Sequence, residues 1–366
     1  AQCLVGSEMC IRDRINTYLL CGGPSSEHEI ALRSALNISK NLDKNKYNLK
    51  IVYIDKKGRF SKAFDFINTD DEFELVKECK ENLLESISDF LLELKDKDKE
   101  NTIIIPCVHG TYGEDGTIQG FLDAIDTAYI GNGLLSSSVC MDKVTANDIF
   151  EKNKLKQARY LYANEESFDL DFAKKCEEYI KFPMIVKPSA NGSSVGVNKA
   201  ENIDDLLKFG KESLKYDEKI LVEEAIIGQE VEIAIIGDNE LIASKPGAYV
   251  TDHIFLDYDA KYFDKSTKEM LPYPMDEKLE KDLLEFAKKC YKACGCQGFA
   301  RVDIFLKDNE FYINEINTFP GFTPTSFFAR LCKISFDLEF SQILDMLIEE
   351  GFKSFQKRRF KWLKEL

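Results

Sequence analysis

The sequence lacks the features that would direct it to a membrane or to nucleic acid. No apolar run approaches the roughly 18 residues that a membrane-spanning helix needs. Positive charge is in the minority, because 49 Lys and Arg face 64 Asp and Glu, for a formal net charge of −15. Such an acidic chain repels nucleic-acid phosphates and anionic lipid surfaces. We therefore expect neither partner, and any polyanionic ligand must be bound by a local cluster of cations and backbone N–H groups.

Zinc and redox motifs are also missing, although the chain has 11 cysteines. They are scattered, with no CxxC pair and no Cys/His spacing typical of zinc sites. Cys294 and Cys296 are separated by one residue, which fits such a site poorly. Because we also find no signal peptide, we expect reduced and mostly buried thiols in a cytoplasmic protein.

Two common nucleotide-binding fingerprints are absent. The GxxxxGK[ST] string of the Walker A loop does not occur, and the glycine-rich string at 110–116 does not match the dinucleotide pattern GxGxxG. An NAD-dependent enzyme is therefore poorly supported. His109, directly before this string, ends a predicted strand, where both a structural and a functional histidine are plausible.

The order of the expected elements predicts the fold class. In the first third of the chain, apolar strands alternate with helices, which predicts a parallel sheet with helices on both faces and ligands at the carboxyl ends of its strands. From about Gly131 the connections shorten and the pattern becomes antiparallel. The expected strands are 16–21, 49–54, 101–107, 182–187, 195–199, 219–223, 230–236, 300–306 and 310–316, and the helices are 27–40, 72–94, 141–153, 283–294 and 336–352.

The last two strands form a hairpin that brings polar residues together. If the hairpin turns about Asn309, Asp303 lies opposite Glu315 and Arg301 lies opposite Asn317, all on one face. Opposed carboxylates repel each other, and a divalent cation removes this penalty. Carboxylate and amide oxygens suit Mg²⁺, and the arginine could stabilise a developing oxyanion. The alternative is a solvated polar face, but the apolar flanking residues favour the metal site.

A loop of small residues at 189–194 follows Lys187 at the end of a strand. Small residues let backbone N–H groups approach a phosphate, and the lysine supplies charge, although an ordinary hairpin turn has the same composition. Lys143 and Lys261 are further candidate phosphate contacts or solvated surface lysines. The long irregular stretch after Gly247 is typical of an active-site lid or of a surface loop.

Seven strings, taken in order, resemble the D-alanine–D-alanine ligase family of the ATP-grasp superfamily. They are GGPSSEHE at 22–29, HGTYGEDG at 109–116, MDK at 141–143, VKPSANGSSVG at 186–196, DYDAKY at 257–262, RVD at 301–303 and NEINTFPG at 314–321. The resemblance implies an α/β protein in which an N-terminal parallel-sheet domain precedes a two-lobed ATP-grasp α+β domain. The expected domains are a substrate-binding domain at 15–131, a central lobe at 132–225, a C-terminal lobe at 226–350 with a lid at 248–268, and a basic tail at 351–366, after a segment at 1–14 that we interpret as non-native.

The implied activity is ligation of two D-alanines to D-alanyl-D-alanine through a D-alanyl phosphate, with ATP as co-substrate, for peptidoglycan synthesis. The cofactors would be two Mg²⁺ ions, with Mn²⁺ as an alternative, and the assembly a homodimer. Ligation of D-alanine to D-serine or D-lactate and other ATP-grasp carboxylate–amine ligations remain alternatives, because Phe327 stands where leucine or methionine is frequent. A nucleotide-binding protein without turnover is disfavoured by the intact set of Arg301, Asp303, Glu315 and Asn317.

The resemblance also implies a role for each site residue. Catalytic roles fall to Glu27, Ser193, Tyr262 and Arg301, and substrate-binding roles to His109, Ser326 and Phe327. The ATP contacts would be Lys143, Lys187, Ser194, Glu223, Glu230 and Lys261. The metal ligands would be Asp303, Glu315 and Asn317.

Overall fold

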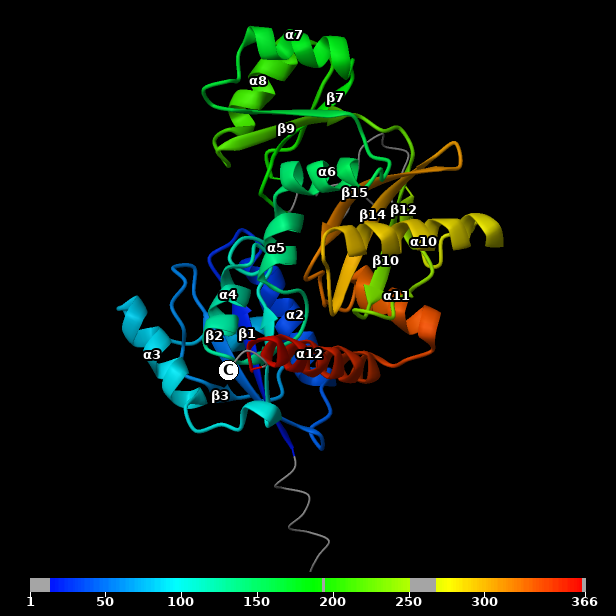
Figure 1. Ribbon diagram of the computed structural model, residues 1–366. Helices are drawn as coiled ribbons and strands as arrows, with labels where there is room; N and C mark the ends of the chain where they lie inside the picture. The colour runs from blue at the N-terminus through cyan, green and yellow to red at the C-terminus, as the bar shows by residue number, and fades with distance from the viewer. Residues whose placement is uncertain (1–13, 193–194, 251–267, 364–366) are drawn as a thin grey trace, which may run out of the picture.

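The computed structural model describes residues 14–192, 195–250 and 268–363 (Figure 1). All but the last residue of the segment interpreted as non-native, and most of the expected lid, therefore lie outside the described residues. The same holds for four predicted site residues, which are Ser193, Ser194, Lys261 and Tyr262.

The N-terminal sheet confirms the predicted parallel architecture. Its strand order is β3-β2-β1-β4-β5, and every pair is parallel except β2 with β3. The strands are β1 (Ile15–Gly22), β2 (Tyr47–Ile54), β3 (Phe64–Asp65), β4 (Thr102–Cys107) and β5 (Ala128–Tyr129). Helix α2 (His28–Asn41) packs on one face, and α3 (Leu83–Leu94) and α4 (Thr117–Ala124) pack on the other. All six residues of β4 are buried, as expected for a strand covered on both faces.

The predicted helix at 72–94 is wrong in its first half. The structure has a short 3₁₀ helix, η1 (Glu72–Leu75), and α3 begins only at Leu83. The Asn82 side chain accepts a hydrogen bond from Glu85 N, so Asn82 is the N-cap of α3. Asparagine favours this position because its side chain satisfies a backbone N–H that the helix leaves unpaired. A second short 3₁₀ helix, η2 (Lys99–Asn101), precedes β4.

The middle of the chain forms a smaller antiparallel sheet, at the top of Figure 1. Its order is β6-β9-β7-β8, with β6 (Tyr160–Asn164), β7 (Met184–Pro188), β8 (Asn198–Ala200) and β9 (Lys219–Glu224). Helices α7 (Leu170–Tyr179) and α8 (Ile203–Ser213) cover it. Helices α5 (Leu134–Met141) and α6 (Lys143–Lys152) connect this sheet to the N-terminal domain.

The C-terminal sheet carries the predicted hairpin, and its register is confirmed. The order is β11-β10-β14-β15, with β10 (Gln229–Ile236), β11 (Ile242–Ala243), β14 (Phe299–Lys307) and β15 (Glu310–Asn317). Asp303 pairs with Glu315, and Arg301 pairs with Asn317. Asp308 and Asn309 in the turn both have positive φ, at 53° and 61°, as a type I′ hairpin turn requires. Strands β12 (Ala248–Val250) and β13 (Lys268–Met270) pair separately, and α10 (Glu277–Ala293) packs on the main sheet.

The last two helices differ from the prediction, which placed one helix at 336–352. Helix α11 (Phe327–Phe336) was not predicted, and it ends where Asp337 adopts a left-handed φ of 54°. Helix α12 (Phe340–Leu363) runs on through the basic tail and crosses to the N-terminal sheet (Figure 1). There the Arg358 guanidinium lies 4.5 Å from the centroid of the Tyr129 ring, and its Nε lies 3.2 Å from Asp123 Oδ1. Ion pairs and packing with another domain, which sequence periodicity does not reveal, therefore extend the helix.

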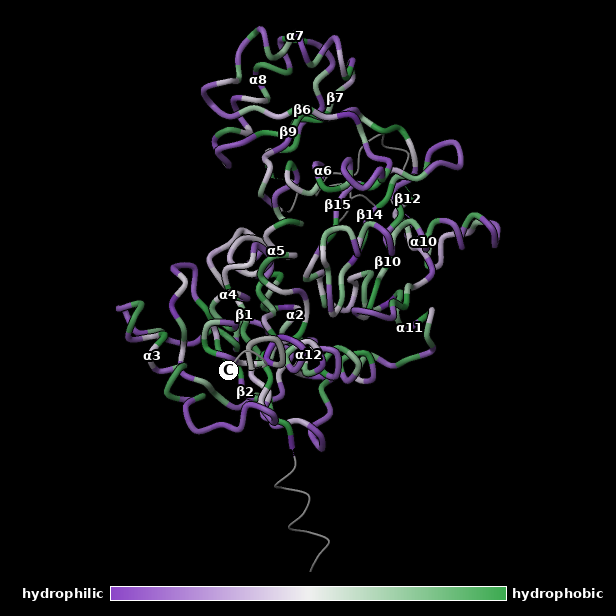
Figure 2. Tube along the Cα trace, in the orientation of Figure 1, coloured by the Kyte–Doolittle hydropathy of each residue, from purple (hydrophilic) through white to green (hydrophobic). Residues whose placement is uncertain are grey.

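Apolar residues concentrate on the strands and on the inner faces of the helices (Figure 2). The described cysteines are free thiols, and all of them except Cys79 are buried. Within the described ranges, no helix is long and apolar enough to cross a membrane.

We expect Phe299→Ala to destabilise the protein by about 3–5 kcal/mol, because it empties the centre of an aromatic cluster. The Phe299 ring is fully buried, and its centroid lies 5.4, 5.7 and 5.3 Å from those of Phe319, Phe322 and Phe328. The measurement is the midpoint of thermal unfolding, with Phe73→Ala as control because that ring is 55% exposed. Equal midpoints for the two variants would contradict the packing described here.

Candidate active site

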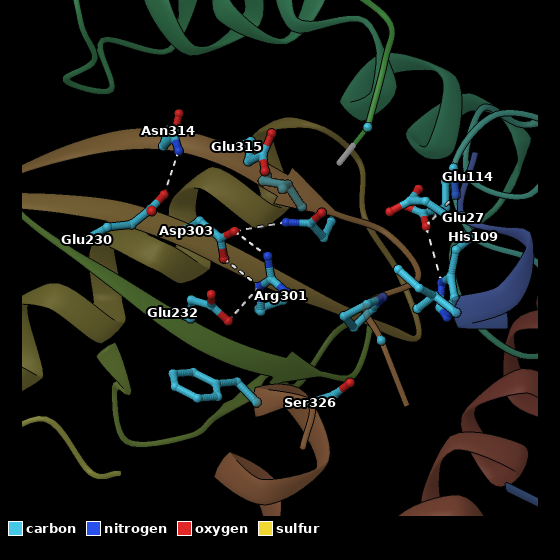
Figure 3. A pocket seen from close by; sticks show the side chains of 18 of the residues that line it. Glu27, His109, Glu114, Glu230, Glu232, Arg301, Asp303, Asn314, Glu315 and Ser326 are labelled. Atoms are coloured by element: carbon cyan, nitrogen blue, oxygen red, sulfur yellow. Dashed lines mark hydrogen bonds and ion pairs between the residues drawn. The ribbon is translucent and has the colours of Figure 1, made fainter. Parts of the chain in front are cut away.

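A cavity of about 860 Å³ lies where the three larger sheets meet. Every predicted site residue within the described ranges lines it, which brings together Glu27, His109, Lys143, Lys187, Glu223, Glu230, Arg301, Asp303, Glu315, Asn317, Ser326 and Phe327. Figure 3 shows Glu27, His109 and Glu114 on one side of this space and the hairpin residues on the other. The cavity therefore joins a cationic loop region, a carboxylate-rich sheet and the N-terminal domain.

The partly buried Arg301 and the buried Asp303 form an ion pair on the face of β14 that lines the cavity. Arg301 donates from Nε to Asp303 Oδ1 at 2.8 Å and from Nη2 to Oδ2 at 2.6 Å (Figure 3). Asn317 Nδ2 donates to the same Oδ2 at 3.0 Å. Burial, together with the Glu232 and Glu315 carboxylates, raises the pKa of Asp303 although Arg301 opposes the shift. The site therefore concentrates negative charge that a further cation would stabilise.

Glu315 faces the central lobe, where it meets Lys143. The Lys143 Nζ lies 3.5 Å from Glu315 Oε2 and donates to the Asn191 carbonyl at 3.0 Å. Lys143 is the first residue of α6, which Asp142 caps by accepting from Thr145 N. Burial alone would raise the pKa of Glu315, but Lys143, Lys187 and Arg301 outweigh it and lower the pKa. Glu315 is therefore ionised at neutral pH, as a metal ligand must be.

Internal strands of the middle and C-terminal sheets contribute further charged residues to the cavity. Lys187 Nζ lies 2.5 Å from Glu223 Oε1, and both side chains are buried. Glu230 Oε1 accepts a hydrogen bond from Asn314 Nδ2 at 2.6 Å (Figure 3). These carboxylates lie on β9 and β10, on either side of the connection between the two sheets. Both carboxylates line the cavity beside this connection.

Glu27 lies directly before α2, against two glycines of other segments. A Cβ added at Gly110 would lie 2.6 Å from Glu27 Oε2, and one added at Gly192 would lie 2.9 Å from the same atom. A side chain at either glycine would have to displace the Glu27 carboxylate, so the small-residue loop approaches the N-terminal domain closely at Glu27. The carboxylate thereby faces the cavity from the end opposite to the hairpin (Figure 3).

His109 is buried and ties the N-terminal domain to the loop after β15. Its Nε2 lies 2.9 Å from Ser34 Oγ, and its Nδ1 lies 3.2 Å from the Phe319 carbonyl and 3.4 Å from Glu114 Oε1. Burial alone would lower the pKa of His109, but Cys107 and Glu114 outweigh it and raise the pKa. These contacts hold the imidazole between the N-terminal domain and the loop after β15.

The start of α11 forms the remaining wall. Ser326 is the residue before this helix, and its Oγ accepts a hydrogen bond from Thr323 N at 3.1 Å. The Phe327 ring stacks on Tyr249 with centroids 4.1 Å apart and an interplanar angle of 12°. This aromatic stack limits the size of any group that binds beside Ser326.

Comparison with known proteins agrees with this geometry. The family model described as D-ala D-ala ligase N-terminus matches residues 16–132, and the one described as D-ala D-ala ligase C-terminus matches residues 149–349. The chain belongs to the D-alanine–D-alanine ligase family. It is 42% identical to the D-alanine--D-alanine ligase of Finegoldia magna, over 94% of this chain and 97% of that protein.

Solved structures of related ligases have the same ATP-grasp fold. The VanG D-Ala:D-Ser ligase of Enterococcus faecalis aligns with a TM-score of 0.77 and 28% identity, over 92% of this chain and 99% of that one. The D-alanine--D-alanine ligase of Bacillus anthracis complexed with ATP aligns with a TM-score of 0.73 and 26% identity, over 94% and 99%. This chain is therefore an enzyme of an ATP-dependent ligase family.

In this member of the D-alanine–D-alanine ligase family, the candidate metal ligands are few. Within the ranges that the structure describes, no group of three or more His, Cys, Asp or Glu side chains is arranged to hold a metal ion. Asp303 and Glu315 with the Asn317 amide offer two carboxylates and one neutral oxygen. Mg²⁺ is commonly bound by one or two carboxylates together with substrate phosphates, so the donor set fits a metal–nucleotide complex.

Several cavity residues of this ligase-family chain were missed from the sequence, among them Glu232, Glu114 and Tyr249. Glu232 is two residues from Glu230, so strand alternation could have placed both on one face. Glu114 lies inside the string HGTYGEDG, yet no local pattern indicates that it contacts His109. No sequence pattern pointed to Tyr249, because its contact with Phe327 joins segments that are distant in the chain.

Proposed function

We propose that this enzyme uses ATP to join two D-alanines into D-alanyl-D-alanine, a precursor of peptidoglycan, through a D-alanyl phosphate. The observation that carries the proposal is the single cavity that joins the Arg301, Asp303, Glu315 and Asn317 cluster to Lys143 and Lys187 and, at its other end, to Glu27. Cations for phosphates, oxygens for a metal ion and an anion for an ammonium group are thus within reach of one bound substrate pair.

In the first step, the carboxylate of one D-alanine attacks the γ-phosphate of ATP and ADP leaves. Glu27 binds the ammonium of this D-alanine, and His109 lies beside it. Lys143 and Lys187 offset the charge on the phosphates, while Glu223 and Glu230 hold the adenine amino group and the ribose. Asp303, Glu315 and Asn317 would hold two Mg²⁺ ions, or Mn²⁺, which neutralise phosphate oxygens when bound.

In the second step, the amine of the other D-alanine attacks the carbonyl carbon of the acyl phosphate, and inorganic phosphate leaves. Arg301 donates hydrogen bonds to the oxyanion of the tetrahedral intermediate. Ser326 and Phe327 bind the carboxylate end of this second substrate. Ser193, Ser194, Lys261 and Tyr262 remain predictions for the loops that would cover the substrates.

Ligation of D-alanine to D-serine or D-lactate is the second candidate. The similarity to a D-Ala:D-Ser ligase and the stacked Phe327 beside Ser326 favour testing it. We further propose a cytoplasmic homodimer that binds small-molecule substrates, with domains at 15–131, 132–225 and 226–350.

The deciding experiment measures ADP release with ATP and Mg²⁺, with products identified by mass. D-Alanine alone, L-alanine, D-alanine with D-serine and D-alanine with D-lactate are compared. Dipeptide formation that depends on D-alanine supports the proposal. Turnover only with a mixed pair moves the assignment to the second candidate, and ATP binding without turnover in any mixture refutes both.

Gly192→Ala is expected to raise KM for the first D-alanine by about tenfold or more, because small displacements of a binding group are costly. The added methyl would lie 2.9 Å from Glu27 Oε2 and must push this flexible carboxylate aside. The measurement is KM for D-alanine and for ATP, with the thermal midpoint as a check on folding. An equal rise in both KM values would show that Glu27 is not the group affected.

A further inference from the structure

Three carboxylates occupy one row across the C-terminal sheet, and the proposed reaction uses only two of them. Glu232 on β10 pairs with Asp303 on β14, and Asp303 pairs with Glu315 on β15. Paired residues on neighbouring strands project to the same face, so all three point toward the cavity, which each of them lines. Asp303 and Glu315 are the candidate metal ligands. Glu232 is a buried carboxylate without a role in the steps described above.

The Glu232 carboxylate contacts the Arg301 guanidinium. Glu232 Oε2 forms an ion pair with Arg301 Nε at 3.0 Å, without hydrogen-bond geometry, while Nε donates its hydrogen bond to Asp303 Oδ1 (Figure 3). The side chains of Arg301, Glu232 and Asp303 are only 15%, 6% and 4% exposed, so water screens these charges weakly. One guanidinium is therefore shared between two buried carboxylates on neighbouring strands.

Asp303 cannot keep both of its hydrogen bonds from Arg301 while it also coordinates a divalent cation. Both of its oxygens accept from Arg301, and Oδ2 also accepts from Asn317. A bound cation takes lone pairs of this carboxylate and repels the guanidinium. Strand β10 lies on the side of β14 away from β15, so Glu232 is an anion on the side of Arg301 that the metal ligands leave open.

We propose that Glu232 is a positioning residue that holds the Arg301 guanidinium in place when Asp303 binds the metal ion, an inference that rests on the proposed function. When the negative charge of Glu232 is removed, Arg301 competes with the cation for Asp303. The cation then binds more weakly, and Arg301 is misplaced for the developing oxyanion. Loss of a partner that orients a ligand or an active-site group typically costs about 10- to 100-fold in metal affinity or activity.

The test is Glu232→Gln, which removes the charge and keeps the size of the side chain. Mn²⁺ is titrated into the protein with a non-hydrolysable ATP analogue and followed by electron paramagnetic resonance. We expect the Kd of Mn²⁺ to rise about tenfold and kcat to fall about 10- to 100-fold, with KM for D-alanine changed by less than about twofold. A lower thermal midpoint with unchanged Mn²⁺ affinity and unchanged kcat would overturn the inference.

A control and a double variant separate this role from a general charge effect. Glu310→Gln removes a charge from the exposed end of the same sheet, where Glu310 pairs with Lys156, and should change neither readout. In an Arg301→Lys background, Glu232→Gln should have a much smaller effect on kcat, because Glu232 acts through Arg301. If the effects of Arg301→Lys and Glu232→Gln on the activation free energy derived from kcat add in full in the double variant, the inference is contradicted. If the unaltered enzyme makes no dipeptide, the proposed function fails, whereas the Mn²⁺ titration still decides the role of Glu232.

Discussion

Glu315→Gln is expected to abolish ligation while the protein stays folded. Glu315 is ionised, lies 3.5 Å from Lys143 and pairs with Asp303 across the hairpin. Glutamine has the same shape but replaces one charged oxygen by an amide that donates hydrogen bonds, so it is a poor metal ligand. Loss of several kcal/mol of charge stabilisation corresponds to a fall in kcat of about a thousandfold or more.

The measurement for this variant is the rate of D-alanine-dependent ADP release at saturating ATP, beside circular dichroism and the thermal midpoint. Glu310→Gln on the same strand is the matched control, because it removes an equal charge outside the cavity. Turnover close to that of the unaltered enzyme would exclude Glu315 as a metal ligand.

Arg301→Met is expected to lose activity and also stability. Asp303 and Glu232 would remain buried without the guanidinium that both contact. Breaking a buried ion pair by removing one partner typically costs about 3–5 kcal/mol, because the other charge is left uncompensated. Loss of an oxyanion donor adds a fall in kcat of about 100- to 1,000-fold.

Arg301→Lys separates these two losses. A lysine keeps the charge but not the planar pair of donors that contacts both oxygens of Asp303, so it should restore most of the stability and little of the activity. Thermal midpoints and kcat of the two variants are compared directly. An Arg301→Met protein as stable as the unaltered one would show that the two carboxylates are not charged together in the folded state.

The sequence predicted the hairpin of the candidate metal site because the information there is local. The two-residue turn pairs Lys307 with Glu310, and a β-bulge between Asp303 and Ile304 shifts the register by one residue, which places Asp303 opposite Glu315 and Arg301 opposite Asn317. Glu232 belongs to the same row of carboxylates, but it is placed by the pairing of β10 with β14, whose partners are some seventy residues apart in the chain. Hydrophobic periodicity carries no information about such a pairing.

Helices were predicted less well where side-chain caps or distant contacts set their ends. The Asn82 cap begins α3 inside a segment whose composition favours helix throughout. Helix α12 continues past the predicted end because its basic residues meet acidic residues of the N-terminal domain, as Arg359 meets Glu100. The resemblance to a ligase family supplied the substrate roles, which geometry alone would not have assigned.

The packing of α12 on the N-terminal sheet has a consequence for synthesis on the ribosome. One core of that sheet combines Leu19, Ile51 and Ile103 with Ile343 and Phe355, from the opposite end of the chain. At about 5–20 residues per second, the first strands wait on the order of ten seconds or more for the helix that covers them. During that time part of their apolar surface stays exposed to solvent and to chaperones. A nascent chain stopped before α12 should therefore be bound by chaperones even though every residue of the cavity has been made.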